Sequence, residues 1–343
     1  MKKILITGLC GFIGAHIIEH ILKTTDWEIV GIDRLSYAST GFDRIKDIEA
    51  FDNKRFKLFT ADFTKPIREY LAEEIGEVDY ILHMGAQTHV DNSIKDPKSF
   101  VEANVIGTFE MLEYARRLKG LKKFIYFSTD EVYGPAPKDY EYKEGDRFNP
   151  GNPYAATKAS AECLCMAYAN TYSMPIIITN TMNVYGERQH PEKFIPLVIN
   201  KVLKGEKVLI HANKDKTKAG SRFWIHGRNV ASAILYILNN TNEELDTHDA
   251  EKGKFNIVGE KEVDNLEMAQ FIAKTLDKEL IYEMVDFHSS RPGHDLRYGL
   301  NGDKMKGLGW TPSKTFEESL SKTIKWTVNN KKWLEVIKYK EQK

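Results

Sequence analysis

The sequence predicts an α/β fold, a doubly wound parallel sheet followed by a smaller C-terminal α/β lobe. Apolar, strand-like runs alternate with amphipathic helical runs through residues 2–181, which is typical of a parallel sheet with helices on both faces. The strand runs are apolar on both sides, as burial of both sheet faces requires. After Gly186 the elements become shorter, and prolines and a lysine-rich stretch interrupt them. This change indicates a second, smaller lobe.

The expected elements follow one another in a regular order. Strands are expected at residues 2–7, 27–33, 56–62, 78–85, 122–129 and 174–181. Helices are expected from the first glycine-rich turn through Leu22, at 66–75, from Ser99 to about Leu118, and at 152–172. We expect residues 1–187 to form the first domain, rejoined by about 226–258, and residues 188–343 to form mainly the second lobe.

Composition excludes several classes of protein. Lys plus Arg and Asp plus Glu each number 49 among 343 residues, and a balanced chain does not indicate binding to nucleic acid or to a membrane surface. The apolar runs are far shorter than the ~20 residues of a membrane span. Cys10, Cys163 and Cys165 are an odd, sparse set, which argues against a disulfide framework or a metal site and favours a reducing cytoplasm.

A glycine-rich turn follows the first expected strand. The stretch TGLCGFIG places Gly8, Gly11 and Gly14 at the start of a helix, where they permit a tight turn and the close approach of a pyrophosphate. Asp33 ends the second strand 19 residues after Gly14. A carboxylate there accepts hydrogen bonds from ribose hydroxyls and repels a 2′-phosphate. The pattern therefore predicts a Rossmann-type domain that binds NAD rather than NADP.

Two further charged residues near this turn have alternative interpretations. Arg34 is either a solvated loop charge or a residue that stacks on adenine. Asp62 ends the third strand and either contacts the adenine amino group or caps a helix.

Candidate catalytic residues lie where the fifth expected strand ends and in the helix that follows. Tyr154 and Lys158 stand four apart in YAATK and therefore share one helical face. An ammonium group beside a phenol lowers the pKa of the phenol, so Tyr154 is a candidate general base, and Lys158 could also hold a nicotinamide ribose. Asp130 and Glu131 directly follow the strand. They either begin an ordinary polar loop or form a catalytic pair.

Several motifs together resemble the extended short-chain dehydrogenase/reductase family: TGLCGFIG, STDEVYG and NPYAATK. Within that family, HVDNSI, TDEVYG, NVYGERQHPEKFIP, RPGHDLRY and LGW resemble the nucleoside-diphosphate-glucose 4,6-dehydratases, of which dTDP-glucose 4,6-dehydratase is the best-known type. The resemblance runs from about Lys2 to Leu334. It implies NAD as cofactor and a nucleoside-diphosphate-glucose as substrate, with dTDP-glucose favoured.

The resemblance also implies a reaction and a set of roles. C4 of the glucosyl unit is oxidised, water is eliminated across C5 and C6, and the same hydride returns to C6. Tyr154 serves as base at the C4 hydroxyl, with Thr129 hydrogen-bonded to the same oxygen. Glu131 removes the C5 proton, and Asp130 protonates the departing C6 hydroxyl. Two adjacent carboxyl groups do not ionise independently, so one can stay protonated near neutral pH.

The implied binding residues extend over both lobes. Arg222 and Arg291 hold the diphosphate, which suits the forked guanidinium group. Further substrate contacts are implied for Thr88, Asn183, Lys193, Phe194, Leu209, His211, Asn256 and His294. Cofactor contacts are implied for Gly8, Gly11, Phe12, Ile13, Gly14, Asp33, Arg34, Ser36, Asp62, Phe63, Met84, Ala86, Tyr154 and Lys158. A homodimer through helices 99–118 and 155–172 is implied as well.

The sequence departs from the family pattern at a few positions. Leu9 and Cys10 are larger than the residues common in the glycine-rich turn, and Gln87 replaces a usual Glu. Leu209 and His211 replace a usual Pro and Tyr near the nucleotide base, which keeps UDP-glucose open as substrate. A C4 epimerase that uses Tyr154 and Lys158 without the acid pair is an alternative function. A non-catalytic NAD-binding protein is a third. The role of the lysine-rich stretch 211–222 stays open.

Overall fold

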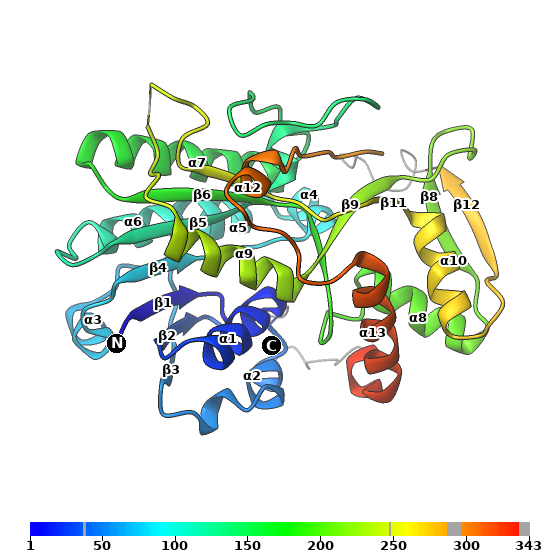
Figure 1. The fold of residues 1–343 in the computed structure, drawn as a ribbon, viewed down its shortest axis with the longest axis horizontal. Helices are drawn as coiled ribbons and strands as arrows, with labels where there is room; N and C mark the ends of the chain where they lie inside the picture. Colours follow the sequence, from blue (N-terminus) through cyan, green and yellow to red (C-terminus); the bar gives the residue numbers. More distant parts are fainter. Residues whose placement is uncertain (37–38, 247, 287–295, 336–343) are drawn as a thin grey trace.

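A seven-stranded parallel sheet forms the centre of the molecule (Figure 1). The computed structural model describes residues 1–36, 39–246, 248–286 and 296–335. The strand order is β10-β6-β5-β4-β1-β2-β3, and every neighbouring pair is parallel. The strands are β1 (Lys3–Thr7), β2 (Glu28–Asp33), β3 (Phe56–Thr60), β4 (Tyr80–His83), β5 (Lys123–Thr129), β6 (Ile176–Thr181) and β10 (Lys254–Ile257). The predicted doubly wound α/β fold is confirmed.

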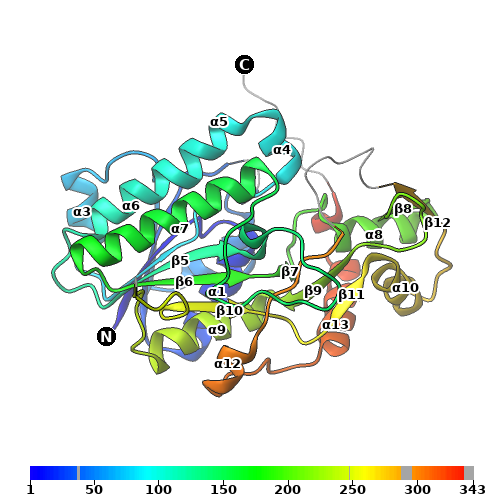
Figure 2. The ribbon, with the colours of Figure 1, turned by 90° about the horizontal axis from the view of Figure 1, so that it is seen from above.

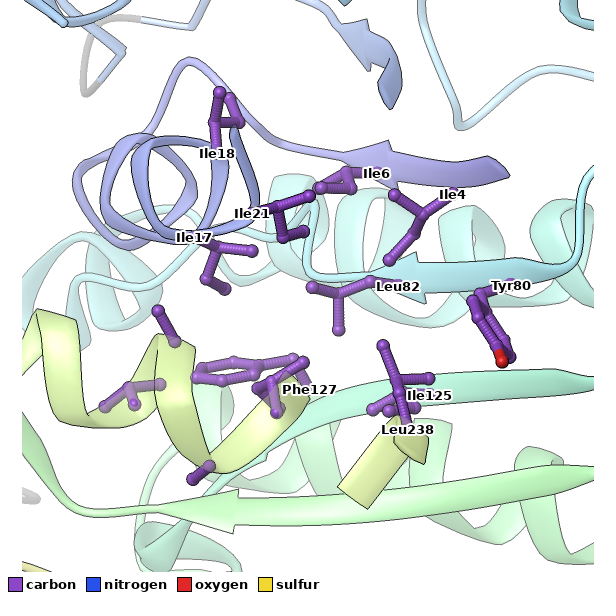
Figure 3. Packing of buried hydrophobic residues seen from close by; sticks show 14 of the residues in the cluster. Ile4, Ile6, Ile17, Ile18, Ile21, Tyr80, Leu82, Ile125, Phe127 and Leu238 are labelled. Carbon is purple, nitrogen blue, oxygen red and sulfur yellow. The ribbon is translucent and has the colours of Figure 1, made fainter. Parts of the chain in front are cut away.

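Helices cover both faces of this sheet, as Figure 2 shows. One face carries α3 (Glu69–Ile75), α6 (Gly107–Ala115) and α7 (Pro153–Tyr172). The other carries α1 (Phe12–Thr24) and α9 (Gly227–Asn240), with α2 (Asp43–Asp47) beside α1. Because side chains alternate along a strand, Ile4 and Ile6 enter the core under α1 and α9, whereas Leu5 enters the opposite core. Figure 3 shows the first of these cores, with Ile17 of α1 near Leu82 and Phe127 of the strands.

One expected helix is less regular than its sequence indicates. The run from Ser99 to about Leu118 is preceded by α4 (Val90–Lys95) and begins within α5 (Pro97–Phe100). A π-helical segment, Val101–Ile106, then joins α5 to α6. Asp96 caps α5 by accepting a hydrogen bond from the Ser99 backbone N–H at 3.3 Å. The helical stretch is therefore continuous in direction but not in hydrogen-bond pattern.

The later part of the chain adds two small sheets, in the portion that the structure describes. One contains β7 (Asn183–Tyr185), β9 (Ser221–His226) and β11 (Glu262–Asp264), and the other β8 (Val208–Ala212) and β12 (Tyr282–Asp286). The accompanying helices are α8 (Phe194–Lys204), α10 (Asn265–Thr275) and α13 (Phe316–Asn329), whereas α12 (Asp303–Gly307) packs against β10 of the large sheet. Ile199, Trp224, Met268 and Leu320 contribute to a third core between them.

The domain boundaries inferred from the sequence stay a prediction. Residues 254–257 form β10 of the large sheet, and α9 packs against α1. None of the helices in the described ranges combines the length and apolar character that crossing a membrane would take.

Candidate active site

A cavity of about 480 Å³ lies where the sheet strands end and the second lobe begins. Residues that follow β1, β2, β4 and β5 form one part of its wall, and residues of α7, α8 and β9 form another. In open parallel sheets, ligands bind at the carboxyl ends of the strands. The position of the cavity therefore agrees with the site expected from the sequence.

The glycine-rich turn is tight because its backbone touches neighbouring backbone. Gly8 has φ +71°, and a Cβ at this position would lie 2.7 Å from the Gly85 Cα. A Cβ on Gly14 would lie 2.5 Å from the Leu9 carbonyl oxygen. Both distances are too short for a side chain. Gly11 is the N-cap residue of α1, and no side chain caps this helix. The first turn of α1 lines the cavity, so its first N–H groups lie beside it.

The large residue Leu9 is accommodated by a glycine on the next strand. Leu9 is fully buried. A Cβ on Gly31 of β2 would lie only 2.1 Å from the Leu9 Cδ1. The Leu9 side chain therefore occupies the space that a side chain at position 31 would need. This contact explains how the turn keeps its shape despite the larger residue.

Asp33 is fixed at the cavity wall by backbone donors. Its Oδ2 accepts a hydrogen bond from the Cys10 N–H at 2.9 Å, and its Oδ1 accepts one from the Leu35 N–H at 2.7 Å. Burial raises the pKa of the Asp33 carboxyl, and these two hydrogen bonds oppose that rise. Arg34 also lines the cavity, and its guanidinium carbon lies 5.6 Å from the centre of the Phe63 ring.

Asp62 does not reach the cavity wall. Its Oδ1 accepts hydrogen bonds from the backbone N–H of Thr64 at 3.0 Å and from the Thr64 hydroxyl at 2.9 Å. The carboxylate thus closes a local turn. Neither of its two interpretations is seen: Asp62 lies outside the cavity wall, and the next helix, α3, begins only at Glu69 with Arg68 as its N-cap.

Thr129, Asp130 and Glu131 come together at the end of β5. The Thr129 hydroxyl donates to Asp130 Oδ1 at 2.9 Å, and Asn152 Nδ2 donates to Glu131 Oε2 at 3.1 Å. Burial raises the pKa of Asp130 to about 6. Burial and the charge of Asp130 raise the pKa of Glu131 to about 7. The two carboxyl groups therefore titrate as a coupled pair near neutral pH.

Tyr154 and Lys158 line the same cavity but do not interact as expected. Lys158 Nζ donates to the Phe127 carbonyl at 2.7 Å and lies 4.2 Å from the centre of the Tyr126 ring. Burial lowers the pKa of Lys158 to about 7. Burial and the charge of Glu131 raise the pKa of Tyr154, although a hydrogen bond with Thr129 opposes the rise.

The expectation that Lys158 lowers the pKa of Tyr154 is therefore wrong for this arrangement. The ammonium group is turned towards a carbonyl and a ring, and the charges that act on the phenol are those of Glu131 and Asp130. A phenolate at Tyr154 is therefore disfavoured while Glu131 and Asp130 carry their charges.

On the substrate side, Arg222 is held in place by backbone carbonyls. One of its terminal nitrogens donates to Ser221 O at 2.7 Å and to Leu296 O at 2.8 Å, and its guanidinium carbon lies 4.6 Å from the centre of the Tyr298 ring. A fixed, partly buried guanidinium suits an anionic ligand. The other expected substrate residues in the cavity wall are Thr88, Asn183, Lys193, Phe194 and His211.

Two expected substrate residues lie outside the cavity wall, and two more fall outside the described residues. Leu209 is 47% exposed on β8, outside the cavity wall. Asn256 is fully buried in β10, where its Nδ2 donates to Tyr142 O at 3.0 Å and to Asn301 O at 3.2 Å. Its amide thus connects loops to the sheet edge instead of reaching a ligand. Arg291 and His294 lie outside the described residues.

All the expected cofactor residues except Asp62 line the cavity: Gly8, Gly11, Phe12, Ile13, Gly14, Asp33, Arg34, Ser36, Phe63, Met84, Ala86, Tyr154 and Lys158. Sequence reasoning missed Arg44, a fully buried arginine in the wall. Its guanidinium donates to Ser39 O at 2.7 Å and to Arg188 O at 2.9 Å. No motif surrounds this residue, so only its burial in the fold reveals it. Within the described ranges, no cluster of His, Cys, Asp and Glu could hold a metal ion.

Comparisons with known proteins agree with this site. A family model described as GDP-mannose 4,6 dehydratase matches residues 5–323. The chain is 34% identical to a dTDP-glucose 4,6-dehydratase of Escherichia coli, over 96% of this chain and 95% of the relative. The solved structure of DesIV, a dTDP-glucose 4,6-dehydratase of Streptomyces venezuelae with NAD and TYD bound, matches with a TM-score of 0.84 and 31% identity, over 97% of this chain and 99% of that one.

The fold is also shared with an enzyme of different activity. A UDP-glucuronic acid 4-epimerase of Bacillus cereus, solved with UDP-glucuronic acid and NAD, matches with a TM-score of 0.83 and 26% identity, over 96% of this chain and 99% of that one. The dehydratase relatives are the more similar in sequence. The chain therefore belongs to the nucleotide-sugar 4,6-dehydratases of the extended short-chain dehydrogenase/reductase family.

Proposed function

We propose that this protein is an NAD-dependent nucleoside-diphosphate-glucose 4,6-dehydratase that converts dTDP-glucose to the 4-keto-6-deoxy sugar nucleotide. The observation that carries the proposal is the acid pair Asp130–Glu131, whose pKa values are raised to about 6 and about 7 in one cavity with Tyr154. A dehydration needs a proton acceptor and a proton donor side by side. An epimerisation needs no such pair.

The residues of the cavity fit NAD. The uncapped start of α1 presents N–H groups beside the cavity, which suits the pyrophosphate. The Asp33 carboxylate at the end of β2 suits the ribose hydroxyls and disfavours a 2′-phosphate. The chemistry that bound NAD supplies is a reversible hydride transfer, taken from C4 of the sugar and returned to C6.

The side chains of this protein supply the proton transfers. Tyr154, hydrogen-bonded to Thr129, is placed to take the proton of the C4 hydroxyl. Between pH 6 and 7 the acid pair holds about one proton. One carboxyl can then accept the C5 proton while its neighbour donates a proton to the departing C6 oxygen. We assign the base to Glu131 and the acid to Asp130, as the family resemblance implies.

A product assay tests the proposal. Purified protein is incubated with dTDP-glucose or UDP-glucose, and the products are analysed by mass spectrometry. We expect a product that has lost one water molecule, without net formation of NADH. Preference for UDP-glucose would change the substrate assignment, since His211 lies in the cavity wall near the expected base. A product of unchanged mass would support an epimerase instead.

The double variant Asp130→Asn/Glu131→Gln separates the two activities. We expect it to lose dehydration by a factor of roughly 10² to 10⁴. An epimerase would keep its activity in this variant.

We further propose that the protein forms a homodimer through the helices around α6 and α7. Val101, Ile106 and Phe109 are 45%, 43% and 39% exposed, and Tyr172 at the end of α7 is 48% exposed. Exposed apolar side chains gathered on neighbouring helices are typical of an interface. Light scattering should give the mass of a dimer for the wild type and of a monomer for Ile106→Glu/Phe109→Glu. A monomeric wild type would exclude this interface.

We also propose that residues 1–187 with about 226–258 bind NAD, that residues 188–343 mainly bind the substrate, and that the protein works in the cytoplasm. The cavity wall supports the division into two lobes. The expected cofactor residues in the wall all precede residue 188, and the expected substrate residues Lys193, Phe194, His211 and Arg222 follow it. The cysteines support the last, because all three are free and Cys163 is exposed.

A further inference from the structure

We propose that Glu162, a buried carboxylate with no part in the proton transfers above, positions the end of β5 and supplies the charge that balances the Lys158 ammonium. Glu162 lies on α7 four residues after Lys158, so the two side chains share one helical face. Its side chain is fully buried. A buried carboxylate is unfavourable unless charges and donors surround it. Its surroundings therefore indicate its role.

Hydrogen bonds connect Glu162 to the two central strands. Its Oε1 accepts from the Ser128 hydroxyl at 2.5 Å and from Asn180 Nδ2 at 2.7 Å. Asn180 Nδ2 also donates to the Thr129 carbonyl at 3.2 Å. Ser128 and Thr129 immediately precede the acid pair. Glu162 thus holds the backbone from which both catalytic carboxyl groups project.

Two buried lysines interact with Glu162. Its Oε2 is 3.8 Å from Lys254 Nζ on β10, and Lys254 is itself 4% exposed, with its ammonium 4.7 Å from the centre of the Phe148 ring. Lys158 lies one helical turn before Glu162 on α7, and the charge of Glu162 raises its pKa. One buried carboxylate thus interacts with two buried ammonium groups, Lys254 at the sheet edge and Lys158 in the cavity wall.

The hydrogen bonds alone do not require a charge at this position, because a glutamine has the same shape and can accept both through its amide oxygen. The charge matters for Lys158. Burial lowers the pKa of Lys158, and the Glu162 carboxylate is the main effect that opposes the decrease. Other titratable groups that face Glu162 or Lys158 are Tyr126, Tyr133, His83, Cys163 and Cys165. None of these residue types carries a negative charge at pH 7 at its ordinary pKa.

Direct titration of Lys158 tests the proposal without any assay of activity. The full chain is labelled with ¹³Cε-lysine, and the Lys158 resonance is assigned with Lys158→Arg. The wild-type midpoint is expected near 7. In Glu162→Gln we expect a decrease of about one pH unit or more, and in Glu162→Asp a return towards the wild-type value. Glu69→Gln, an exposed change on α3, is the control and should have no effect.

An unchanged Lys158 midpoint in a folded Glu162→Gln protein would overturn the proposal. If that variant does not fold, Glu162→Gln/Lys254→Met also removes the Lys254 ammonium, which the single variant leaves buried without its carboxylate partner. The Lys158 midpoint of this double variant must also lie below that of the wild type.

A kinetic measurement, which rests on the proposed function, tests whether the lower pKa of Lys158 changes the pH dependence of catalysis. The alkaline limb of kcat/KM against pH should move to lower pH in Glu162→Gln and recover in Glu162→Asp. A uniform loss at every pH would indicate a merely structural role. Absence of dehydratase activity in the wild type would defeat the proposed function, whereas the titration would still decide the role of Glu162.

Discussion

Burial controls the protonation of Asp130, and this has a measurable effect on stability. The folded protein raises the pKa of Asp130 from 3.8 to about 6. The folded state therefore binds a proton more tightly than the unfolded state. The stability contributed by the protonated group is fully present below about pH 4 and is lost as the pH rises through about 6.

Asp130→Asn should remove this pH dependence. Relative to the wild type, we expect the variant to gain about 2 kcal/mol of unfolding free energy between pH 4.5 and pH 8. Urea denaturation at both pH values measures the difference. Asp303→Asn, a change of a mostly exposed carboxylate, serves as control. Parallel stability curves for Asp130→Asn and the wild type would contradict the expectation.

Leu9 and Gly31 form a second testable pair. In Gly31→Ala the new methyl group meets the Leu9 side chain, so we expect a loss of about 1–3 kcal/mol from overpacking. Leu9→Ala alone should lose about 2–5 kcal/mol because it leaves a cavity. The double variant should lose clearly less than the sum, since each change relieves the other. Additive losses in urea denaturation would show that the two residues do not compete for space.

Among single residues, the sequence predicted those site residues that lie in recognisable motifs or at the ends of strands. Thr129, Asp130, Glu131, Tyr154 and Lys158 all line one cavity. Asn256 and Leu209 do not, because the direction of a side chain on a peripheral strand depends on packing that spacing does not encode. The four-residue spacing also could not predict how Lys158 affects the pKa of Tyr154. That effect depends on the direction of the ammonium group, which points to the Phe127 carbonyl and the Tyr126 ring.

Among the elements, α7 connects helix stability to catalysis through its N-cap residue, Asn152. Asn152 Oδ1 accepts a hydrogen bond from the Ala155 N–H at 2.8 Å, which caps the helix, while its Nδ2 donates to Glu131. One side chain therefore caps the N-terminus of the helix that carries Tyr154 and Lys158 and also donates a hydrogen bond to Glu131.

Substitutions at Asn152 should separate these two effects. Asn152→Ala should lose about 1 kcal/mol of stability with the cap, together with activity. Asn152→Ser should keep the cap and lose the donor to Glu131, so we expect nearly wild-type unfolding but reduced kcat at pH 7. Urea denaturation and steady-state kinetics test both. Equal kcat for Asn152→Ser and the wild type would show that Glu131 needs no such donor.

The order and type of the elements in the first half followed from alternation of apolar and amphipathic runs. The π-helical segment 101–106 did not, because its residues carry the same amphipathic pattern as an α-helix. Strands β7 and β11 have three residues each. Such strands are too short to show an alternating apolar pattern, so the sequence did not predict them.

In the whole molecule, the turn Lys331–Leu334 late in the chain packs against the region of α2 near its beginning. Trp333 is 4% exposed, and the Arg44 guanidinium carbon lies 5.6 Å from the centre of its ring. Lys332 Nζ lies 2.6 Å from Asp47 Oδ1 on α2. Since Arg44 lines the cavity, this turn supports the cofactor end of the site from behind.

Trp333→Ala should weaken both stability and NAD binding. We expect a loss of about 3–5 kcal/mol of unfolding free energy and a higher Kd for NAD, measured by urea denaturation and calorimetry. Trp333→Phe keeps an aromatic face above Arg44 and should lose less of each. Equal behaviour of the two variants would show that the ring does not support Arg44.

The position of β10 has a consequence for synthesis. The last strand of the central sheet is made only at residues 254–257, long after β6, its neighbour. On the ribosome, the nascent chain must therefore carry an open β6 edge while more than seventy further residues are translated. Unpaired edges invite association with other chains, so truncated products that stop before residue 254 will depend on chaperones to stay dispersed.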